Sequence, residues 1–419
     1  MKVLWLGHFV PWPPVAGALI RSFHLVREIS GHCEVALLCL NQKARLPSPK
    51  LVEDARRNLA PLCALIEILP IPAEAWSFSR ERVVIQSALS GRSYDEVWLR
   101  SRALTARLAE VVKSFRPDVI HFDTVGLAPQ AAALPKTPLI LNHHNIESQM
   151  MERRSSLEPA PLMRAMLRRQ ARALARLECS TATRFHSHLV VSELDGERLS
   201  SLIPGAYIEV IPNGVDLEYF GALSPTRAFA PHSLVFAGGL DWYPNRTAVS
   251  WLINEIFPRL RARFPDATAT IIGRNPPPDF LRIAEQTPGL SFTGFVDDIR
   301  PLIAASAVYA CPIFDGGGTR LKILDALAQQ IPLVATTMAV EGVGVVSGRH
   351  ALLADTADEF ADCVATIFSD PARGVEIASA GRRLVEQNFG WPSIGSRLVA
   401  AYRTAIDRFA DAVQPVSAH

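Results

Sequence analysis

A glycine-rich loop is the first feature of this sequence that could do chemistry. Three consecutive glycines at 316–318 follow the apolar run 308–313, and the apolar spacing of 323–331 predicts a helix directly after the loop. Free N–H groups and the helix dipole favour an anion at such a helix start, and glycines let the anion approach the backbone. Arg320 and Lys322 add positive charge, which favours a pyrophosphate over a single carboxylate.

The same loop also has a purely structural interpretation. Three glycines make a tight turn, and Lys322 with Asp325 would form an i, i+3 ion pair on the helix surface. The spacing matches neither the Walker loop nor the dinucleotide-binding fingerprint. Spacing alone therefore leaves both interpretations open.

Two groups of polar residues end apolar runs that predict strands. The first group is His121 and Asp123, and the second is His143, His144, Asn145 and Glu147. Because polar residues at the carboxyl ends of parallel strands face the ligand-binding edge of an α/β sheet, we expect catalytic or acceptor-binding roles for them. A zinc site is not expected, because adjacent histidines on a strand point to opposite faces and neither a Cys nor a helical His partner is evident.

The elements that must position these residues alternate along the chain. Twelve apolar runs predict strands, at 2–9, 33–40, 65–71, 118–123, 138–145, 188–193, 233–240, 268–273, 290–295, 308–313, 332–337 and 350–355. Apolar strands separated by helical stretches are typical of a parallel sheet covered on both faces. A chain of 419 residues exceeds one ordinary core. We therefore predict an α/β fold with two doubly wound domains and a boundary near 195–215, where a short strand precedes a Pro-Asn-Gly-Val-Asp turn.

Composition excludes several classes of protein. Hydrophobic residues make up 49% and charged residues 20% of the chain, which fits a compact core, and a net charge of +2 gives no general argument for nucleic acid binding. The six cysteines show no CxxC pair, which favours free, mostly buried thiols in a reducing cytosol. No apolar run is long enough to span a membrane, and the hydrophobic start lacks the pattern of a signal peptide.

One predicted helix, at 161–178, is strongly amphipathic. At about 100° per residue, one stripe comprises Met163, Met166, Leu167, Gln170, Leu174 and Leu177. The opposite face comprises Arg164, Arg168, Arg169, Arg172 and Arg176. The helix either packs on its own domain with a solvated arginine face, or rests that face on anionic lipid or a lipid pyrophosphate.

The segment from 314 to 330 is similar to the nucleotide-sugar-binding signature of family 4 retaining glycosyltransferases, which have the two-domain GT-B fold. In that family two Glu residues separated by seven others close the donor site, and amides between them hold the donor phosphates. The resemblance puts Asp325 at the second Glu, which binds ribose, and Gly317 at the first, so the first side chain is missing. The resemblance implies a donor-phosphate site made of Gly316, Gly317, Gly318, Thr319, Arg320, Leu321 and Lys322.

Other segments extend this resemblance over nearly the whole chain, most specifically over 209–342. It implies an acceptor domain at 1–200, a donor domain at 201–389 and closing helices at 390–415 that return to the first domain, with the two domains facing a cleft. It places Gly17 beside the donor phosphate. It also implies that Gly273, Arg274, Phe295, Val296 and Asp297 border the base, that Asp123 and His121 lie at the active-site histidine position, and that His144, Asn145 and Glu147 lie on the acceptor side.

The expected activity is transfer of a sugar from a nucleoside diphosphate to a hydroxyl of a polysaccharide or glycolipid precursor, with retention of anomeric configuration. Arg320 and Lys322 would stabilise the departing diphosphate, and His121, Asp123 and His144 would surround the sugar, without a metal or other cofactor. A cytoplasmic enzyme is expected, with the arginine face as a contact to the membrane. Two alternatives stay open: a non-catalytic nucleotide-sugar sensor or assembly partner, and a nucleotide-sugar epimerase on the same fold.

Overall fold

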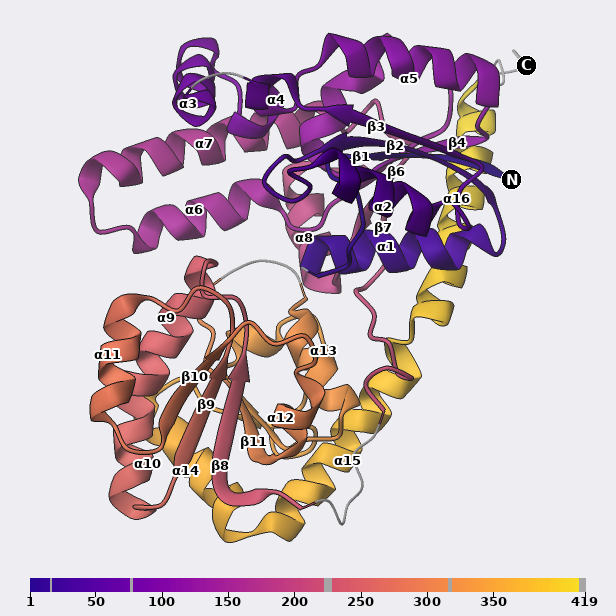
Figure 1. Cartoon of the computed structure of the whole chain (residues 1–419). Coiled ribbons are helices and arrows are strands. Elements are labelled where there is room, and N and C mark those ends of the chain that lie inside the picture. Colours follow the sequence, from indigo (N-terminus) through magenta and orange to yellow (C-terminus); the bar gives the residue numbers. More distant parts are fainter. Residues whose placement is uncertain (16, 76–77, 222–227, 316–318, 414–419) are drawn as a thin grey trace. The chain divides into compact units, whose positions relative to one another are not determined.

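The computed structural model describes residues 1–15, 17–75, 78–221, 228–315 and 319–413 (Figure 1). The chain divides into two compact units, Met1–Pro212 with Trp391–His419 as unit 1 and Asn213–Gly390 as unit 2. The predicted glycine loop, Gly316, Gly317 and Gly318, lies outside the described residues. Unit 1 is discontinuous in sequence, because unit 2 is inserted between its last strand and its last helix.

Unit 1 is built on a seven-stranded parallel sheet. Its strands are β1 Lys2–Gly7, β2 Glu34–Asn41, β3 Leu65–Pro70, β4 Val119–Phe122, β5 Leu139–Asn142, β6 Ser187–Val190 and β7 Ile208–Val210. Their spatial order is β3-β2-β1-β4-β5-β6-β7. The order reverses between β1 and β4, and ligands bind at such a switch point in doubly wound sheets.

Helices cover both faces of this sheet. They are α1 Gly17–Ser30, α2 Pro49–Leu59, α3 Ser79–Ser90, α4 Tyr94–Trp98, α5 Arg102–Phe115, α6 Glu147–Leu157, α7 Pro161–Ser180, α8 Glu193–Leu202 and α16 Trp391–Val413, with 3₁₀ helices η1 Pro72–Ala75 and η2 Val125–Ala133. Alternate residues of β4 show how both faces are filled. Ile120 and Phe122 join the core beneath α5, whereas Val119 joins the core that α1, α2 and α16 cover.

Unit 2 repeats the architecture with a six-stranded parallel sheet. Its strands are β8 Ala230–Ala237, β9 Thr268–Ile272, β10 Leu290–Gly294, β11 Ser306–Cys311, β12 Leu333–Ala335 and β13 Leu352–Leu353, in the order β10-β9-β8-β11-β12-β13. Its helices are α9 Tyr243–Trp251, the π-helical turn η3 Leu252–Ile256, α10 Phe257–Arg263, α11 Pro278–Gln286, α12 Arg300–Ala304, α13 Leu321–Ala328, the 3₁₀ turn η4 Met338–Val340, α14 Ala357–Ser369 and α15 Pro371–Asn388. This sheet has its switch point between β8 and β11.

The predicted fold class is confirmed: two doubly wound parallel sheets are present. All twelve predicted runs contain a strand, and the short strand expected after residue 206 is β7. The runs were predicted too long at their ends, since 138–145 becomes β5 Leu139–Asn142 and 350–355 becomes β13 Leu352–Leu353.

The basic helix 161–178 is α7, which lies beside α6 as a helical hairpin (Figure 1). The prediction that Met163 and Met166 share the buried stripe is wrong, because both are exposed while Leu167, Leu174 and Leu177 are buried. The first two turns of α7 extend beyond the core that covers its later turns. The arginine face is also only partly solvated, since Arg169 and Arg176 donate to backbone carbonyls at the end of α3, Ser87 O and Gly91 O.

Within the part of the chain that the structure describes, no helix combines the length and the apolar character needed to cross a bilayer. All six cysteines are free thiols. Cys33, Cys39 and Cys311 are buried as expected, whereas Cys179 at the end of α7 is exposed.

Candidate functional site

In unit 1 a network of buried polar groups lies at the sheet's switch point, centred on Asp123 just after β4. Its Oδ2 accepts a hydrogen bond from Ser22 Oγ of α1 at 2.7 Å, and its Oδ1 accepts one from Asn142 Nδ2 at the end of β5 at 3.1 Å. His144 Nε2 lies 3.2 Å from the same Oδ1. Asp123 is fully buried, whereas the His144 side chain is 12% exposed. Of the three partners of this carboxylate, His144 is the most exposed. It is therefore the partner that a substrate could contact.

His121 lies behind Asp123 and is fully buried. The strand register pairs His121 with Trp5, and the two rings stack at 3.7 Å with an interplanar angle of 11°. Its Nδ1 lies 3.0 Å from the hydroxyl of Tyr402 on α16, and its Nε2 lies 3.8 Å from Asp123 Oδ1. The structure thus places His121 where it supports Asp123 from within the core.

Electrostatics distinguish these groups. Burial would raise the pKa of Asp123, but His144 and His121 outweigh it and hold this pKa well below its usual range. Burial lowers the pKa of His121, and the attraction of Asp123 offsets only part of that shift. At neutral pH the network therefore contains a buried carboxylate beside a neutral His121.

Arg21, at the buried side of α1, has a structural task. Its guanidinium donates to Pro212 O and Ile211 O, both at 2.8 Å, and to Asn142 Oδ1 at 3.1 Å. It ties α1 to the last residues of unit 1 and to the Asp123 network. Gly17 is the exposed first residue of the same helix.

The predicted acceptor-side residues Asn145 and Glu147 are half-buried at the start of α6. Burial, then the nearby Asp95 and Glu178, raise the pKa of Glu147 to about 8, while a hydrogen bond from Asn145 opposes the shift. Glu147 is therefore largely protonated at neutral pH and able to donate a hydrogen bond.

In unit 2 the ammonium of Lys322 reaches from the first turn of α13 to the end of β8. Its Nζ donates to Asn245 Oδ1 of α9 at 2.7 Å and lies 4.4 Å from the centre of the Phe236 ring. A Cβ at Gly238 would stand 2.5 Å from this nitrogen. The missing side chain at Gly238 thus makes the space that the ammonium occupies. Burial lowers the pKa of Lys322 to about 8.

Arg320 is the residue before α13 and is buried. Its Nη1 lies 3.8 Å from Glu341 Oε2, and the backbone carbonyl of the buried Thr319 accepts a hydrogen bond from Asn213 Nδ2 at 3.0 Å. These contacts hold the start of α13 in place. Leu321 follows as its first residue.

Asp325 lies one turn further along α13, half-buried. Burial raises the pKa of its carboxyl to about 8, against the opposing attraction of Lys322. The predicted i, i+3 ion pair between Lys322 and Asp325 does not form, because the ammonium turns to Asn245 instead.

The residues predicted to border the base follow β9 and β10. Gly273 lies so close to β8 that a Cβ would collide with the carbonyl oxygen of Gly238. Arg274 is paired with Asp241 at 3.0 Å. After β10, Phe295 is 68% exposed, Val296 packs partly on the core, and Asp297 is exposed.

Four site residues were missed by the sequence analysis: Ser22, Asn142, Asn245 and Tyr402. Asn142 carried a usable signal, because it is a polar residue at the end of an apolar strand. Ser22, Asn245 and Tyr402 lie inside helices, where nothing in the pattern marks which polar residue turns to the site. Across the residues with described positions, no group of three or more His, Cys, Asp or Glu is arranged to hold a metal ion.

Comparison with known families gives matches in both units. Residues 23–219 match the family model described as Glycosyltransferase Family 4, and residues 231–370 match the model described as Glycosyl transferases group 1. Together the two matches cover most of the chain, and each falls on one of the two sheets.

Two relatives and one solved structure are similar to this chain. Glycogen synthase of Mycobacterium tuberculosis is 25% identical over 312 residues, which is 70% of this chain and 70% of the relative. A GDP-mannose-dependent alpha-(1-6)-phosphatidylinositol monomannoside mannosyltransferase of the same organism is 27% identical over 231 residues, 50% of this chain and 59% of the relative. The structure of the Anabaena protein HepE in complex with UDP shares the fold, with a TM-score of 0.65 at 16% identity over 96% of this chain and all of that one.

The fold and the matches to both halves confirm the resemblance that the sequence carried. This chain belongs to the group 1, family 4 type of glycosyltransferases and has the GT-B fold.

Proposed function

We propose that this enzyme transfers a sugar from a nucleoside diphosphate to a hydroxyl group of a polysaccharide or glycolipid precursor, with retention of anomeric configuration. Unit 2 binds the donor nucleotide, and unit 1 supplies the groups that meet the sugar and the acceptor. The observation that carries the proposal is the Lys322 ammonium, which lies at the switch point of the unit 2 sheet in the space left by the missing side chain of Gly238.

The charges of unit 2 fit a diphosphate. Arg320 and Lys322 stand at the start of α13, where the helix dipole adds partial positive charge. Lys322 is held by an uncharged amide oxygen, so its charge is not neutralised by that partner. A donor diphosphate would supply the missing anion. HepE, which shares the fold, has been solved with UDP.

In the proposed reaction the acceptor oxygen attacks the anomeric carbon on the face from which the diphosphate leaves. The bond between that carbon and the diphosphate oxygen breaks as the new glycosidic bond forms, and the acceptor proton passes to the departing phosphate oxygen. Arg320 and Lys322 stabilise the charge that develops on the diphosphate. These cations take the role a metal ion would otherwise have, and we propose that the reaction requires none.

His144 is the unit 1 residue proposed to meet the sugar. Asp123 fixes the orientation of the imidazole through Nε2, and Asn142 and Ser22 fix Asp123 in turn. His121 and Asp123 are buried, so their proposed role is to position His144. Asp325 is proposed to bind ribose hydroxyls, for which its carboxyl has both donor and acceptor capacity when protonated.

The acceptor class is proposed from the relatives. One relative is a glycogen synthase, and another is a mannosyltransferase whose name gives a phosphatidylinositol mannoside as acceptor. These names give a glycan and a glycolipid as the molecules acted on. We therefore propose a hydroxyl group of such a precursor as the acceptor here.

The test begins with a screen of nucleotide sugars for thermal stabilisation, because a donor well above its Kd raises the unfolding temperature. The stabilising donor is then incubated with enzyme, with and without glycan acceptors, in buffer containing EDTA. NMR of the product or of slowly hydrolysed sugar should show the donor's anomeric configuration. An inverted product, or activity lost in EDTA and restored by a metal, contradicts the corresponding part of the proposal.

Variants tie the activity to the proposed site. Lys322→Ala and Arg320→Ala should each lower kcat/KM on the order of tenfold or more, because each removes a charged hydrogen bond to the diphosphate. Lys113→Ala, an exposed lysine of unit 1, is the matched control. Normal transfer by both variants would refute the phosphate assignment. An epimerised donor would identify an epimerase, and donor binding without turnover would identify a sensor.

A further inference from the structure

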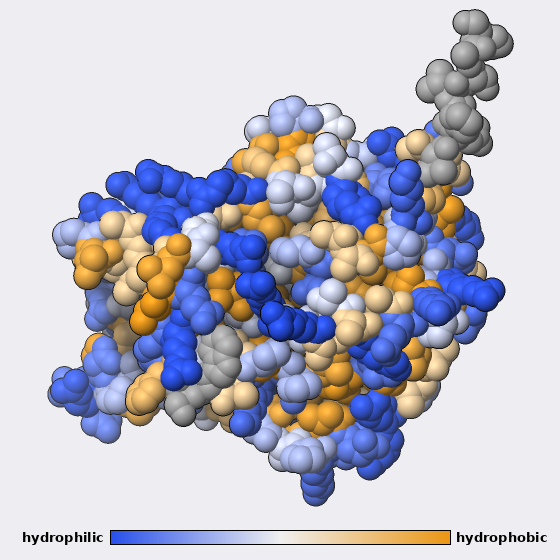
Figure 2. Space-filling model, turned by 90° about the horizontal axis from the view of Figure 1, so that it is seen from above, coloured by the Kyte–Doolittle hydropathy of each residue, from blue (hydrophilic) through white to orange (hydrophobic). Residues whose placement is uncertain are grey.

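Exposed apolar side chains gather on one part of unit 1. Sixteen large hydrophobic residues are exposed among the described residues, and seven of them lie on α3 with its preceding residue or on the α6–α7 hairpin. The seven are Phe78, Ile85, Leu89, Leu157, Leu162, Met163 and Met166. In Figure 2, orange side chains appear between blue ones on the left, where α3 and the hairpin lie in Figure 1. We call this set the apolar tip.

The apolar tip is not a frayed edge of the core. Leu162 and Leu89 are each 85% exposed, and Leu157 is 66% exposed. Leu162 and Met166 stand four residues apart, so they form one stripe on α7, and Ile85 and Leu89 form a second stripe on α3 by the same spacing. Two ordered stripes of exposed aliphatic side chains are more than the scattered single residues that soluble surfaces ordinarily show.

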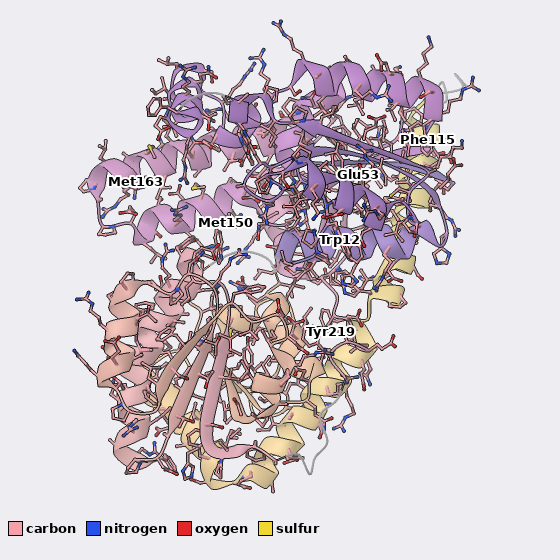
Figure 3. The ribbon with its side chains drawn as sticks, in the orientation of Figure 1. Trp12, Glu53, Phe115, Met150, Met163 and Tyr219 are labelled. Carbon is pink, nitrogen blue, oxygen red and sulfur yellow. The ribbon has the colours of Figure 1, made fainter. Side chains whose placement is uncertain are left out.

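The two stripes belong to one surface. Leu162, Met166 and Arg169 fall on one side of α7, and Arg169 donates to the carbonyls of Ser87 and Ala88 at the end of α3. Gln170 Nε2 also donates to Ser87 Oγ at 2.7 Å. The stripe on α7 therefore runs toward the end of α3 that carries Leu89. Met163, labelled in Figure 3, lies near the turn of the hairpin.

Arginines flank this apolar surface. Arg168 and Arg172 are exposed on α7, one helical turn apart, beside the stripe formed by Leu162 and Met166. Arg80 and Arg82 are exposed on α3. For Arg168 and Arg172 the described residues provide no hydrogen bond or ion pair, so their charge is not committed within the protein.

We propose that the apolar tip docks on the surface of an anionic lipid bilayer. The aliphatic side chains of α3 and the hairpin enter the boundary between headgroups and acyl chains, and Arg168 and Arg172 bind lipid phosphates beside them. A second copy of the chain fits this surface less well, because it would place the same arginines against one another. The docking surface does not depend on the proposed sugar-transfer chemistry, and its test uses no sugar.

The experiment is sedimentation of the full chain with vesicles of phosphatidylcholine alone or mixed with phosphatidylglycerol. We expect binding to the mixed vesicles and little to the neutral ones, with binding that falls as salt rises. Leu162→Ser with Met166→Ser, and separately Arg168→Glu with Arg172→Glu, should each weaken partition on the order of tenfold or more. All four positions are exposed, so circular dichroism and the unfolding temperature should stay unchanged.

Matched controls come from exposed residues elsewhere. Leu281→Ser with Val375→Ser removes two exposed apolar side chains outside the apolar tip, and Arg282→Glu with Arg403→Glu makes the same change of charge. Both controls should bind like the parent chain. The proposal fails if the parent chain does not bind the mixed vesicles, or if the tip variants bind as well as the controls. It also fails if analytical ultracentrifugation shows a dimer that the Leu162 and Met166 substitutions dissociate.

Discussion

At the scale of the single residue, Asp123 combines complete burial with a pKa held well below its usual range. A buried carboxylate is costly unless its oxygens are satisfied, and here Ser22, Asn142 and His144 satisfy them. The compensating partners come from three different elements, α1, the end of β5 and the segment after it. The ionised state of Asp123 therefore depends on all three elements being in place.

Asp123→Asn should lower the free energy of unfolding at neutral pH by about 1.5–3 kcal/mol, because the amide replaces a carboxylate that accepts charge-assisted hydrogen bonds. Because the folded pKa lies below the unfolded one, the carboxylate stabilises the fold above about pH 4 and loses this effect as pH falls further. The difference between parent and variant should therefore shrink on acidification. Urea unfolding at several pH values measures it, with the exposed Asp279→Asn as control. An equal difference at all pH values would contradict the ionised state.

Lys322 gives a second prediction, for donor binding. Burial lowers the pKa of Lys322 to about 8, so the ammonium loses its charge as pH rises through that value. Affinity for UDP or GDP should therefore fall between about pH 7 and about pH 9. Asp325 also ionises near pH 8 and acts in the same direction, because it adds negative charge near the diphosphate. Titration calorimetry measures Kd over this range, and Lys322→Arg, which stays charged, should reduce the slope. A slope that Lys322→Arg leaves unchanged would exclude Lys322 as the source.

At the scale of the element, the ends of β8 and β9 approach each other so closely that two glycines are required for different reasons. At Gly238 the obstacles to a side chain are the ends of the Lys322 and Asn245 side chains. At Gly273 the obstacle is the backbone carbonyl of Gly238, which cannot move without separating the strands. Gly238 therefore leaves space for the Lys322 ammonium, and Gly273 allows the ends of β8 and β9 to lie side by side.

These two positions should respond differently to alanine. Gly238→Ala should weaken nucleotide binding by on the order of tenfold, because the methyl group displaces the ammonium, and should change the unfolding temperature little. Gly273→Ala should lower the unfolding temperature by several degrees, since about 1 kcal/mol or more of strain enters unit 2. Calorimetric unfolding and nucleotide titration of both variants measure the contrast. If instead Gly238→Ala lowered the unfolding temperature and Gly273→Ala weakened nucleotide binding, steric collision would not explain why these two positions are glycines.

The sequence predicted elements better than it predicted contacts. Apolar runs located every strand, because burial on both faces of a parallel sheet leaves a strong local signal. It did not predict that Lys322 turns to Asn245, 77 positions away, or that Tyr402 meets His121 across 281 positions. Such pairs depend on how helices lie on the sheet, which no local pattern records. For the same reason the methionines of α7 were placed in the core, although that part of the helix extends beyond it.

At the scale of the whole molecule, each unit has its own sheet and its own hydrophobic core. Nucleotide binding should therefore slow hydrogen exchange in the unit that binds the nucleotide. With saturating UDP or GDP, hydrogen exchange should slow in peptides that contain the end of β8 and the start of α13, because ligand contacts hold those amides closed. Peptides from α2 and α5 of unit 1 provide the internal reference. Protection confined to unit 1 would show that the nucleotide binds elsewhere.

The discontinuity of unit 1 has a consequence for biosynthesis. Trp391, Leu398 and Tyr402 of α16 complete the core on one face of the first sheet, but the ribosome makes all of unit 2 before it reaches them. At about 5–20 residues per second, that face stays uncovered for roughly 10–40 s in a growing chain. Unit 2 is contiguous, so its entire core emerges before α16. We therefore expect the order of folding to reverse the order of translation, with the second unit complete while the first still waits for its final helix.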